Sequence, residues 1–170
     1  MTATTATTNP APIAVIRSCT FRVGGDCFAI DAERVTEVIR AGRVARVPLA
    51  PEGLLGLVHL RGRIVPIVDL ADRLGLRRGA ADGTGTHLIV EAQGDRYGLL
   101  VDEMLDVIDI PADRVEHPAD AAVAHEAIGG VFAAPGRLVH LLDPERMIQS
   151  LVRPRITAPT RHGASHGPPR

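Results

Sequence analysis

The stretch Gly56–Asp69, GLVHLRGRIVPIVD, decides the fold of this chain, because a degraded copy of it, GVFAAPGRLVHLLD, recurs at Gly130–Asp143. Five residue pairs are identical at one constant spacing: Gly56/Gly130, Gly62/Gly136, Arg63/Arg137, Val65/Val139 and Asp69/Asp143. The upstream segments also align without a gap, GDCFAIDAERVTEVI at residues 25–39 with GDRYGLLVDEMLDVI at residues 94–108. The chain is therefore one small β unit used twice.

Turn residues divide each unit into hairpins. Gly24-Gly25 and Gly94-Asp95 lie between apolar or alternating runs, which predicts a tight turn at each place. In the second copy of the repeated stretch the turn pair is Pro135-Gly136, which suits a type II turn. The aligned pair in the first copy is Arg61-Gly62. Since Pro-Gly can form a turn here, its geometry does not require a guanidinium, and Arg61 becomes the leading candidate for a functional residue.

Composition limits the class of protein. A chain of 170 residues with 45% hydrophobic content can bury a core as one domain or two small lobes. The net charge of −1 and the 2% aromatic content are unlike the basic, aromatic surfaces of nucleic-acid binders. No run approaches the roughly 18 apolar residues of a membrane span, and residues 1–12 lack the features of a secretory signal. We therefore expect a cytoplasmic protein, with Cys19 and Cys27 as small buried strand residues.

The pattern predicts one folded region between two disordered ends. Residues 1–12 are Thr/Ala/Pro-rich and should be disordered, residues 13–150 should fold, and residues 151–170 should form a flexible basic tail. Along residues 64–70 both alternating faces are largely apolar, which predicts a strand buried on both sides. Pro66 cannot donate to a β ladder, so one side of that strand should be an edge or a bulge.

The sequence indicates no catalytic or metal site. Its seven histidines form no HExxH motif and lie near no Gly-x-Ser-x-Gly elbow, and its glycines match no phosphate-binding motif. The repeated aspartates Asp69 and Asp143 could be read as a carboxylate dyad, but an acid before a short helix is more simply an N-cap, and Pro144 strengthens that reading. We therefore expect a protein that is not an enzyme and that has no cofactor and no metal.

Several segments together resemble the CheW-like domain family. The string GLVHLRGRIVPIVDLADRLGL, from Gly56, resembles that family's hallmark stretch G-v-x-N-L-R-G-x-i-x-P-V-x-D-L followed by a short helix. FRVGGDCFAIDAERVTEVIR resembles its opening hairpin and V-x-E-V/I strand, and VARVPLAPEGLLG, LLVDEMLDVIDI and GRLVHLLDPERMI resemble its later segments, in the right order. The resemblance covers residues 13–150. One departure is His59, where the family usually has Asn.

The resemblance implies an all-β fold of two SH3-like five-stranded barrels with short helices, one barrel per repeat. The first barrel is expected at about residues 20–76 and the second at about residues 87–143, and exchange of terminal strands between them stays open. The implied function is a non-catalytic scaffold that couples the cytoplasmic tips of chemoreceptors to the regulatory domain of a CheA-type histidine kinase. Such adaptors are cytoplasmic, are recruited to membrane-associated arrays, and can contact other CheW-like domains in array rings.

The family's functional positions carry over to eight residues here. The receptor-facing candidates are Arg61, Gly62, Glu37, Val35, Val101 and Asp102. The candidates for kinase contact are Gly56 and Leu57. Two alternatives remain open: a CheW-like adaptor of a non-flagellar array, serving twitching, gliding or development, and, more distantly, a small-barrel nucleic-acid-binding module. The sequence does not identify the receptor, the kinase or the output system.

Overall fold

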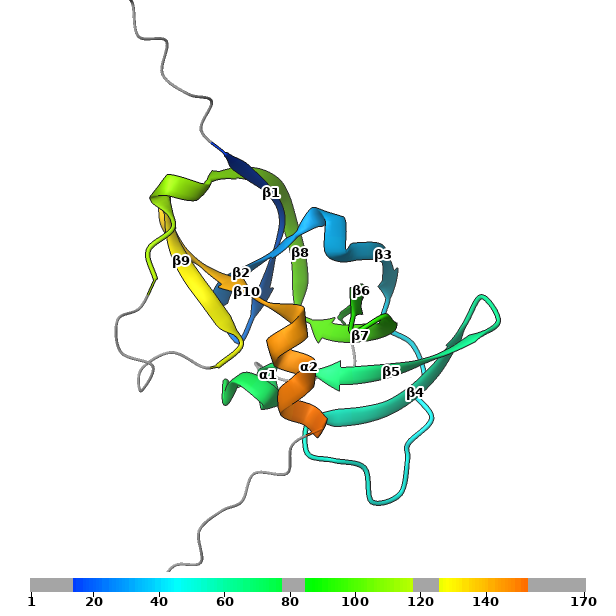
Figure 1. Cartoon of the computed structure of the whole chain (residues 1–170). Helices are drawn as coiled ribbons and strands as arrows, with labels where there is room; N and C mark the ends of the chain where they lie inside the picture. The colour runs from blue at the N-terminus through cyan, green and yellow to red at the C-terminus, as the bar shows by residue number, and fades with distance from the viewer. Residues whose placement is uncertain (1–13, 78–84, 118–125, 153–170) are drawn as a thin grey trace, which may run out of the picture.

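The computed structural model describes residues 14–77, 85–117 and 126–152 (Figure 1). The expected disordered segment 1–12 lies outside the described residues, as does the expected tail beyond residue 152. Residues 151 and 152, which were assigned to that tail, are the last two of helix α2 (Pro144–Val152).

Two five-stranded sheets make up the fold. Lobe A contains, in spatial order, β8 (Glu103–Pro111), β1 (Val15–Val23), β2 (Asp26–Asp31), β10 (Arg137–Leu142) and β9 (Ile128–Ala134). Lobe B contains, in spatial order, β3 (Val35–Arg40), β6 (Thr86–Ala92), β7 (Asp95–Val101), β5 (Arg63–Asp69) and β4 (Leu54–Leu60). The remaining elements are helix α1 (Leu70–Leu74), helix α2 and the 3-10 turns η1 (Ala32–Arg34) and η2 (Ala112–Arg114). Helix α2 lies between the lobes (Figure 1).

The lobes exchange strands between the two repeats. Lobe A combines the β1–β2 hairpin of the first repeat with β8, β9 and β10 of the second, and lobe B combines β3, β4 and β5 with the β6–β7 hairpin. The sheets therefore divide the chain differently from the barrels expected at residues 20–76 and 87–143, and the strand exchange left open by the sequence is extensive. The exchange buries both faces of the hairpins: Phe28 and Ile30 of β2 join the core shared by the lobes, while Cys27 and Ala29 join the core of lobe A.

Each sheet is closed by the segment that follows its edge strand. Ala45, beyond β3, bridges to Leu57 in β4, and Glu116, beyond β8, bridges to Val131 in β9. Each bridge consists of two backbone hydrogen bonds of 2.8 to 2.9 Å. These bridges connect the outer strands of each five-stranded sheet, so the expected fold class of two small β-barrels is confirmed.

Three hydrophobic clusters hold the molecule together. The largest takes side chains from both sheets and both helices, and its fully buried members include Phe21, Leu70, Leu99 and Met147. A smaller cluster fills each barrel, around Ile110 and Val139 in lobe A and around Val65, Ile67 and Ile89 in lobe B. The two lobes therefore share one hydrophobic core.

Strand β5 only partly matches its expected burial. Val65 and Ile67 point into lobe B and Val68 into the shared core, as a strand buried on both faces requires. The expectation was wrong for Ile64, whose side chain is 69% exposed. The reason is that the β4–β5 hairpin extends beyond the rest of its sheet (Figure 1).

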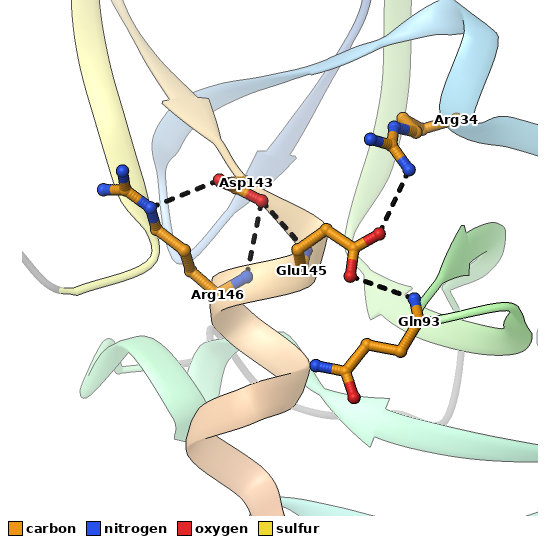
Figure 2. Close-up of polar contacts among 5 residues, drawn as sticks. All are labelled: Arg34, Gln93, Asp143, Glu145 and Arg146. Atoms are coloured by element: carbon orange, nitrogen blue, oxygen red, sulfur yellow. Dashed lines mark hydrogen bonds and ion pairs between the residues drawn. The ribbon is translucent and has the colours of Figure 1, made fainter.

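Both repeated aspartates are helix caps, as predicted. Asp69 accepts hydrogen bonds from the backbone N–H groups of Ala71 and Asp72 at the start of α1. Asp143 accepts from the N–H groups of Glu145 and Arg146 at the start of α2 (Figure 2). These bonds satisfy N–H groups that have no partner within the helix.

Two carboxylates tie the hairpin turns to the connections between lobes. Glu145 accepts a hydrogen bond of 3.0 Å from the Gln93 N–H in the β6–β7 turn and lies 3.1 Å from Arg34 Nη1 in η1 (Figure 2). At the related place in lobe A, Asp102 accepts a 2.7 Å hydrogen bond from the Gly24 N–H in the β1–β2 turn. Both η1 and Asp102 lie where the chain passes from one lobe to the other. These contacts therefore link the hairpin turns to the segments that connect the two lobes.

Candidate interaction site

The structure brings Arg61 and Glu37 together. Arg61 lies in the turn between β4 and β5, and Glu37 lies on β3 at the opposite edge of the lobe B sheet. Barrel closure places Arg61 Nη2 3.0 Å from Glu37 Oε2. The side chain of Arg61 is 77% exposed and that of Glu37 is 18% exposed. Two residues predicted from separate motifs therefore form one surface ion pair.

The turn differs from the one that the second repeat predicted. Arg61 and Gly62 have φ values of +48° and +79°, so both central residues are left-handed, as in a type I′ turn. Proline cannot adopt a positive φ, so the Pro135-Gly136 turn of the other repeat has a different geometry. A left-handed conformation costs a residue such as arginine about 1–2 kcal/mol, and the fold would favour glycine or asparagine here. The local backbone therefore gives no reason for arginine at position 61.

Arg61 is available to a partner. A guanidinium has five N–H donors, and the contact with Glu37 uses one nitrogen of a largely exposed group. An ion pair this exposed contributes only about 0–1 kcal/mol to stability, so its main effect is to orient the guanidinium. The oriented donors can then bind a carboxylate or a backbone carbonyl of another protein.

The other receptor-facing candidates are placed as follows. Gly62 is in the exposed turn, where a Cβ would meet nothing within 4 Å. Val35 is half-buried against the shared core, and Val101 is fully buried in it, so both have a structural role. Asp102 holds the Gly24 N–H and also lines a groove with a volume of about 490 Å³, together with Val38 of β3. Only Arg61, Gly62 and Glu37 form one cluster, and Asp102 lies by a groove that includes the residue next to Glu37.

The kinase-contact candidates lie at the closure of lobe B. Leu57 exchanges two backbone hydrogen bonds of 2.8 Å with Ala45. Gly56 has a φ of +145°, and a Cβ there would collide with the Ala45 carbonyl oxygen and lie 2.8 Å from Val44 Cγ1. Gly56 therefore allows the segment around Ala45 to approach β4 closely, which is sufficient to explain its repetition in the sequence as Gly130.

Exposed aliphatic side chains were missed by the sequence analysis. Val38 and Val107 occupy the same position in the two repeats and are 47% and 60% exposed, and Ile64 and Leu138 form a second such pair at 69% and 52%. The signal in the sequence was that both members of each pair are apolar at aligned positions of the two repeats. The structure adds that these positions are exposed in both copies. Of these four residues, Val38 follows Glu37 in β3. Exposed apolar side chains are common in protein interfaces.

Burial shifts the pKa of two thiols and one imidazole. Burial raises the pKa of the Cys19 thiol, with a further contribution from Asp31, and burial raises the pKa of Cys27. Burial lowers the pKa of His87, which is 2% exposed. Within the described ranges, no group of three or more His, Cys, Asp and Glu residues is placed to hold a metal ion, and no helix is long and apolar enough to cross a membrane.

Comparison with known proteins identifies the family. The family model for the CheW-like domain matches residues 17–152. This chain belongs to the CheW-like domain family. The CheW-like chain is 34% identical to the chemotaxis protein CheW of Rhizobium meliloti, over 76% of this chain and 85% of the relative. It is 32% identical to the protein FrzA of Myxococcus xanthus, over 76% of this chain and 83% of the relative.

A solved structure supports the CheW-like fold. The crystal structure of the scaffolding protein TtCheW from Thermoanaerobacter tengcongensis superposes with a TM-score of 0.73 at 24% sequence identity. The similarity covers 79% of this chain and 92% of that one. The resemblance seen in the sequence is therefore confirmed at the level of family and fold.

Proposed function

We propose that this CheW-like protein is a non-catalytic adaptor of a chemosensory array, which couples the cytoplasmic tips of chemoreceptors to a CheA-type histidine kinase. Membership of the CheW-like family supports this function, and relatives named as chemotaxis protein CheW support it further. The observation that carries the proposal is the exposed Arg61–Glu37 ion pair, in a turn whose backbone does not favour arginine.

An adaptor needs surfaces rather than a reaction centre. Oriented charges specify a partner, while apolar side chains such as Val38 supply buried area. Because the two lobes share one core, a partner that binds lobe B can alter the binding of another partner elsewhere as a coupling free energy. We place the receptor contact at Arg61, Gly62 and Glu37. The protein would be cytoplasmic and would reach the membrane only through the array.

The kind of array that this protein serves is determined by the receptor and the kinase that it binds. Relatives named FrzA and PilI match this chain at 32% identity, so an adaptor of a non-flagellar array is the second candidate function. Both candidates use the same surface and the same physical mechanism. They differ in the receptor and kinase that the protein would recover from its own cytoplasm.

The test is a pull-down from native cytoplasm with three matched proteins: the wild type, Arg61→Glu and Arg46→Glu. Arg46 is an exposed arginine outside the candidate site. We expect the wild type and Arg46→Glu to recover a CheA-type kinase and chemoreceptors, and Arg61→Glu to lose at least one of them while keeping its melting temperature. Recovery of both partners by Arg61→Glu would contradict the placement of the receptor contact. Recovery of neither partner by the folded wild type would contradict the function.

A charge-swapped variant separates two roles of the ion pair. In Glu37→Arg/Arg61→Glu the ion pair is restored with opposite polarity. If the pair only orients the hairpin, the double variant should recover its partners. If Arg61 itself binds the receptor, as we propose, the double variant should remain defective.

A further inference from the structure

Lobe B has an open groove at a place where lobe A is closed. In lobe A the parallel ladder between β10 and β2 begins with Val139 opposite Cys27. In lobe B the ladder between β5 and β7 begins with Ile67 opposite Gly98, two residues further along the aligned repeat. Before that point β5 and β7 diverge around a groove with a volume of about 390 Å³, lined by residues 63–66 and 95–97. The pseudo-symmetry of the fold therefore does not extend to this groove.

Two substitutions between the repeats explain the opening. Pro66 occupies the position of His140, and proline has no N–H to donate to a ladder with β7. In lobe A the His140 ring packs against Phe28 with ring centroids 5.4 Å apart, and Phe28 is buried. The residue aligned with Phe28 in lobe B is Tyr97, which is half-buried and lines the groove. Side chains thus fill the site in lobe A and leave it accessible in lobe B.

The groove presents donors without partners. Arg63 and Arg96 line it, and neither forms a hydrogen bond or ion pair with any residue in the described part of the chain. The Tyr97 hydroxyl likewise has no hydrogen-bond partner among those residues. The lobe A residue aligned with Arg63 is Arg137, which lies 3.1 Å from Asp106. Asp95 is the acidic residue of the lining, so cationic groups outnumber acidic ones there by two to one.

We propose that this groove binds an extended acidic segment of a partner protein. The diverging parts of β5 and β7 leave strand edges to which an extended peptide can hydrogen-bond, as in β-strand addition. Ile64, at 69% exposure, offers an apolar contact for an alternate side chain of that peptide. Two guanidiniums and a phenol match carboxylates and repel a basic segment. This surface lies on the β7 side of the β4–β5 hairpin, whereas Arg61 pairs with Glu37 of β3.

The test uses the full chain and a fluorescein-labelled peptide of sequence EVDIEVDI, with binding followed by fluorescence anisotropy. We expect saturable binding that weakens with salt, and no binding of the basic peptide KVKIKVKI. The double variant Arg63→Glu/Arg96→Glu should weaken binding by at least about tenfold, while Arg46→Glu should change it by less than about twofold. An N-methylated version of the acidic peptide, which keeps its charges but cannot pair with a strand edge, should also bind at least about tenfold more weakly.

Three results would overturn the proposal: no binding of the acidic peptide up to about 1 mM, equal binding by the double variant, or tighter binding of a hexadeoxythymidylate. Circular dichroism checks that the variants fold. If Arg63→Glu/Arg96→Glu does not fold, the neutral double variant Arg63→Gln/Arg96→Gln is used in its place. Arg61→Glu should bind the peptide normally. A negative peptide-binding assay would therefore leave the proposed adaptor function untouched, and a negative pull-down would leave the proposed peptide groove untouched.

Discussion

Gly56→Ala is the substitution that best separates a structural role from a binding role. Gly56 was a candidate for kinase contact, but the structure places it where Ala45 crosses beside β4. A methyl group at position 56 would collide with the Ala45 carbonyl oxygen, and the backbone has a φ of +145°. To accommodate alanine, the closing segment must move away from β4 or the strand must change conformation. Either response opens lobe B.

The expected loss of stability in Gly56→Ala is the sum of a backbone strain and the loss of two hydrogen bonds. An L-residue held in such a backbone conformation costs about 1–3 kcal/mol. Separation of the strands also removes the two hydrogen bonds between Ala45 and Leu57, each worth about 1 kcal/mol. We therefore expect the free energy of unfolding to fall by about 3–5 kcal/mol, a large share of the roughly 5–15 kcal/mol of a typical domain.

Urea unfolding followed by circular dichroism measures this loss, with two glycine variants as controls. Gly62→Ala meets no atoms within 4 Å and should cost only the left-handed conformation, about 1–2 kcal/mol. Gly130→Ala would place a Cβ 2.5 Å from Val115 Cγ1, a side chain that can move, so it should fall between the other two. A Gly56→Ala protein as stable as Gly62→Ala would refute the closure argument and return Gly56 to the candidates for partner contact.

Three further predictions concern stability. Val65→Asp should lower the free energy of unfolding by about 4 kcal/mol or more, because it buries an unpaired carboxylate, whereas Ile64→Asp, one residue away and exposed, should change it by less than about 0.5 kcal/mol; urea titration of the two variants measures both. Glu145→Ala should cost about 1–2 kcal/mol through the Gln93 N–H, and Arg34→Ala less than about 1 kcal/mol because its ion pair is exposed; a larger loss for Arg34→Ala would reverse that assignment. Burial lowers the pKa of His87, so below the unfolded value of about 6.5 the unfolded chain binds a proton that the folded chain does not. The free energy of unfolding should therefore decrease as the pH is lowered below about 6.5, by up to about 1.4 kcal/mol per pH unit. His87→Leu should flatten that slope below about pH 6.5, and a slope unchanged in His87→Leu would assign it to other groups.

The internal repeat made much of the fold predictable. Identical turn glycines, the Asp69 and Asp143 caps and the two apolar faces of residues 65–68 all follow from local rules that apply within one repeat. The distribution of strands between sheets does not follow from them. Strand β2 pairs with β1 of its own repeat and, on its other side, with β10 of the second repeat rather than with β5. The pairing with β10 joins residues more than a hundred positions apart, which periodicity cannot reveal.

The candidate site was predictable only through differences between the copies. Arg61 was found because the other repeat has Pro135 at the aligned position, and Glu37 because of its motif, but their 3.0 Å contact depends on closure of the barrel. Val101 entered the list through its motif, and the structure shows a fully buried core residue. A motif position cannot distinguish a side chain that faces a partner from one that faces the core, since both are constrained.

The pseudo-symmetry of this fold supplies its own control for function. Where packing alone acts, the two lobes should keep equivalent residues, as they do for Gly56 and Gly130 at the closures. Where the lobes differ at equivalent positions, packing is not the common cause. Arg61 stands against Pro135, and Pro66 against His140; the first difference produces an exposed, oriented guanidinium and the second opens a groove beside unpaired donors. Both differences lie in lobe B, at its β4–β5 hairpin, so the receptor contact and the peptide groove proposed above are on the same lobe, while the core beneath them is built by both lobes.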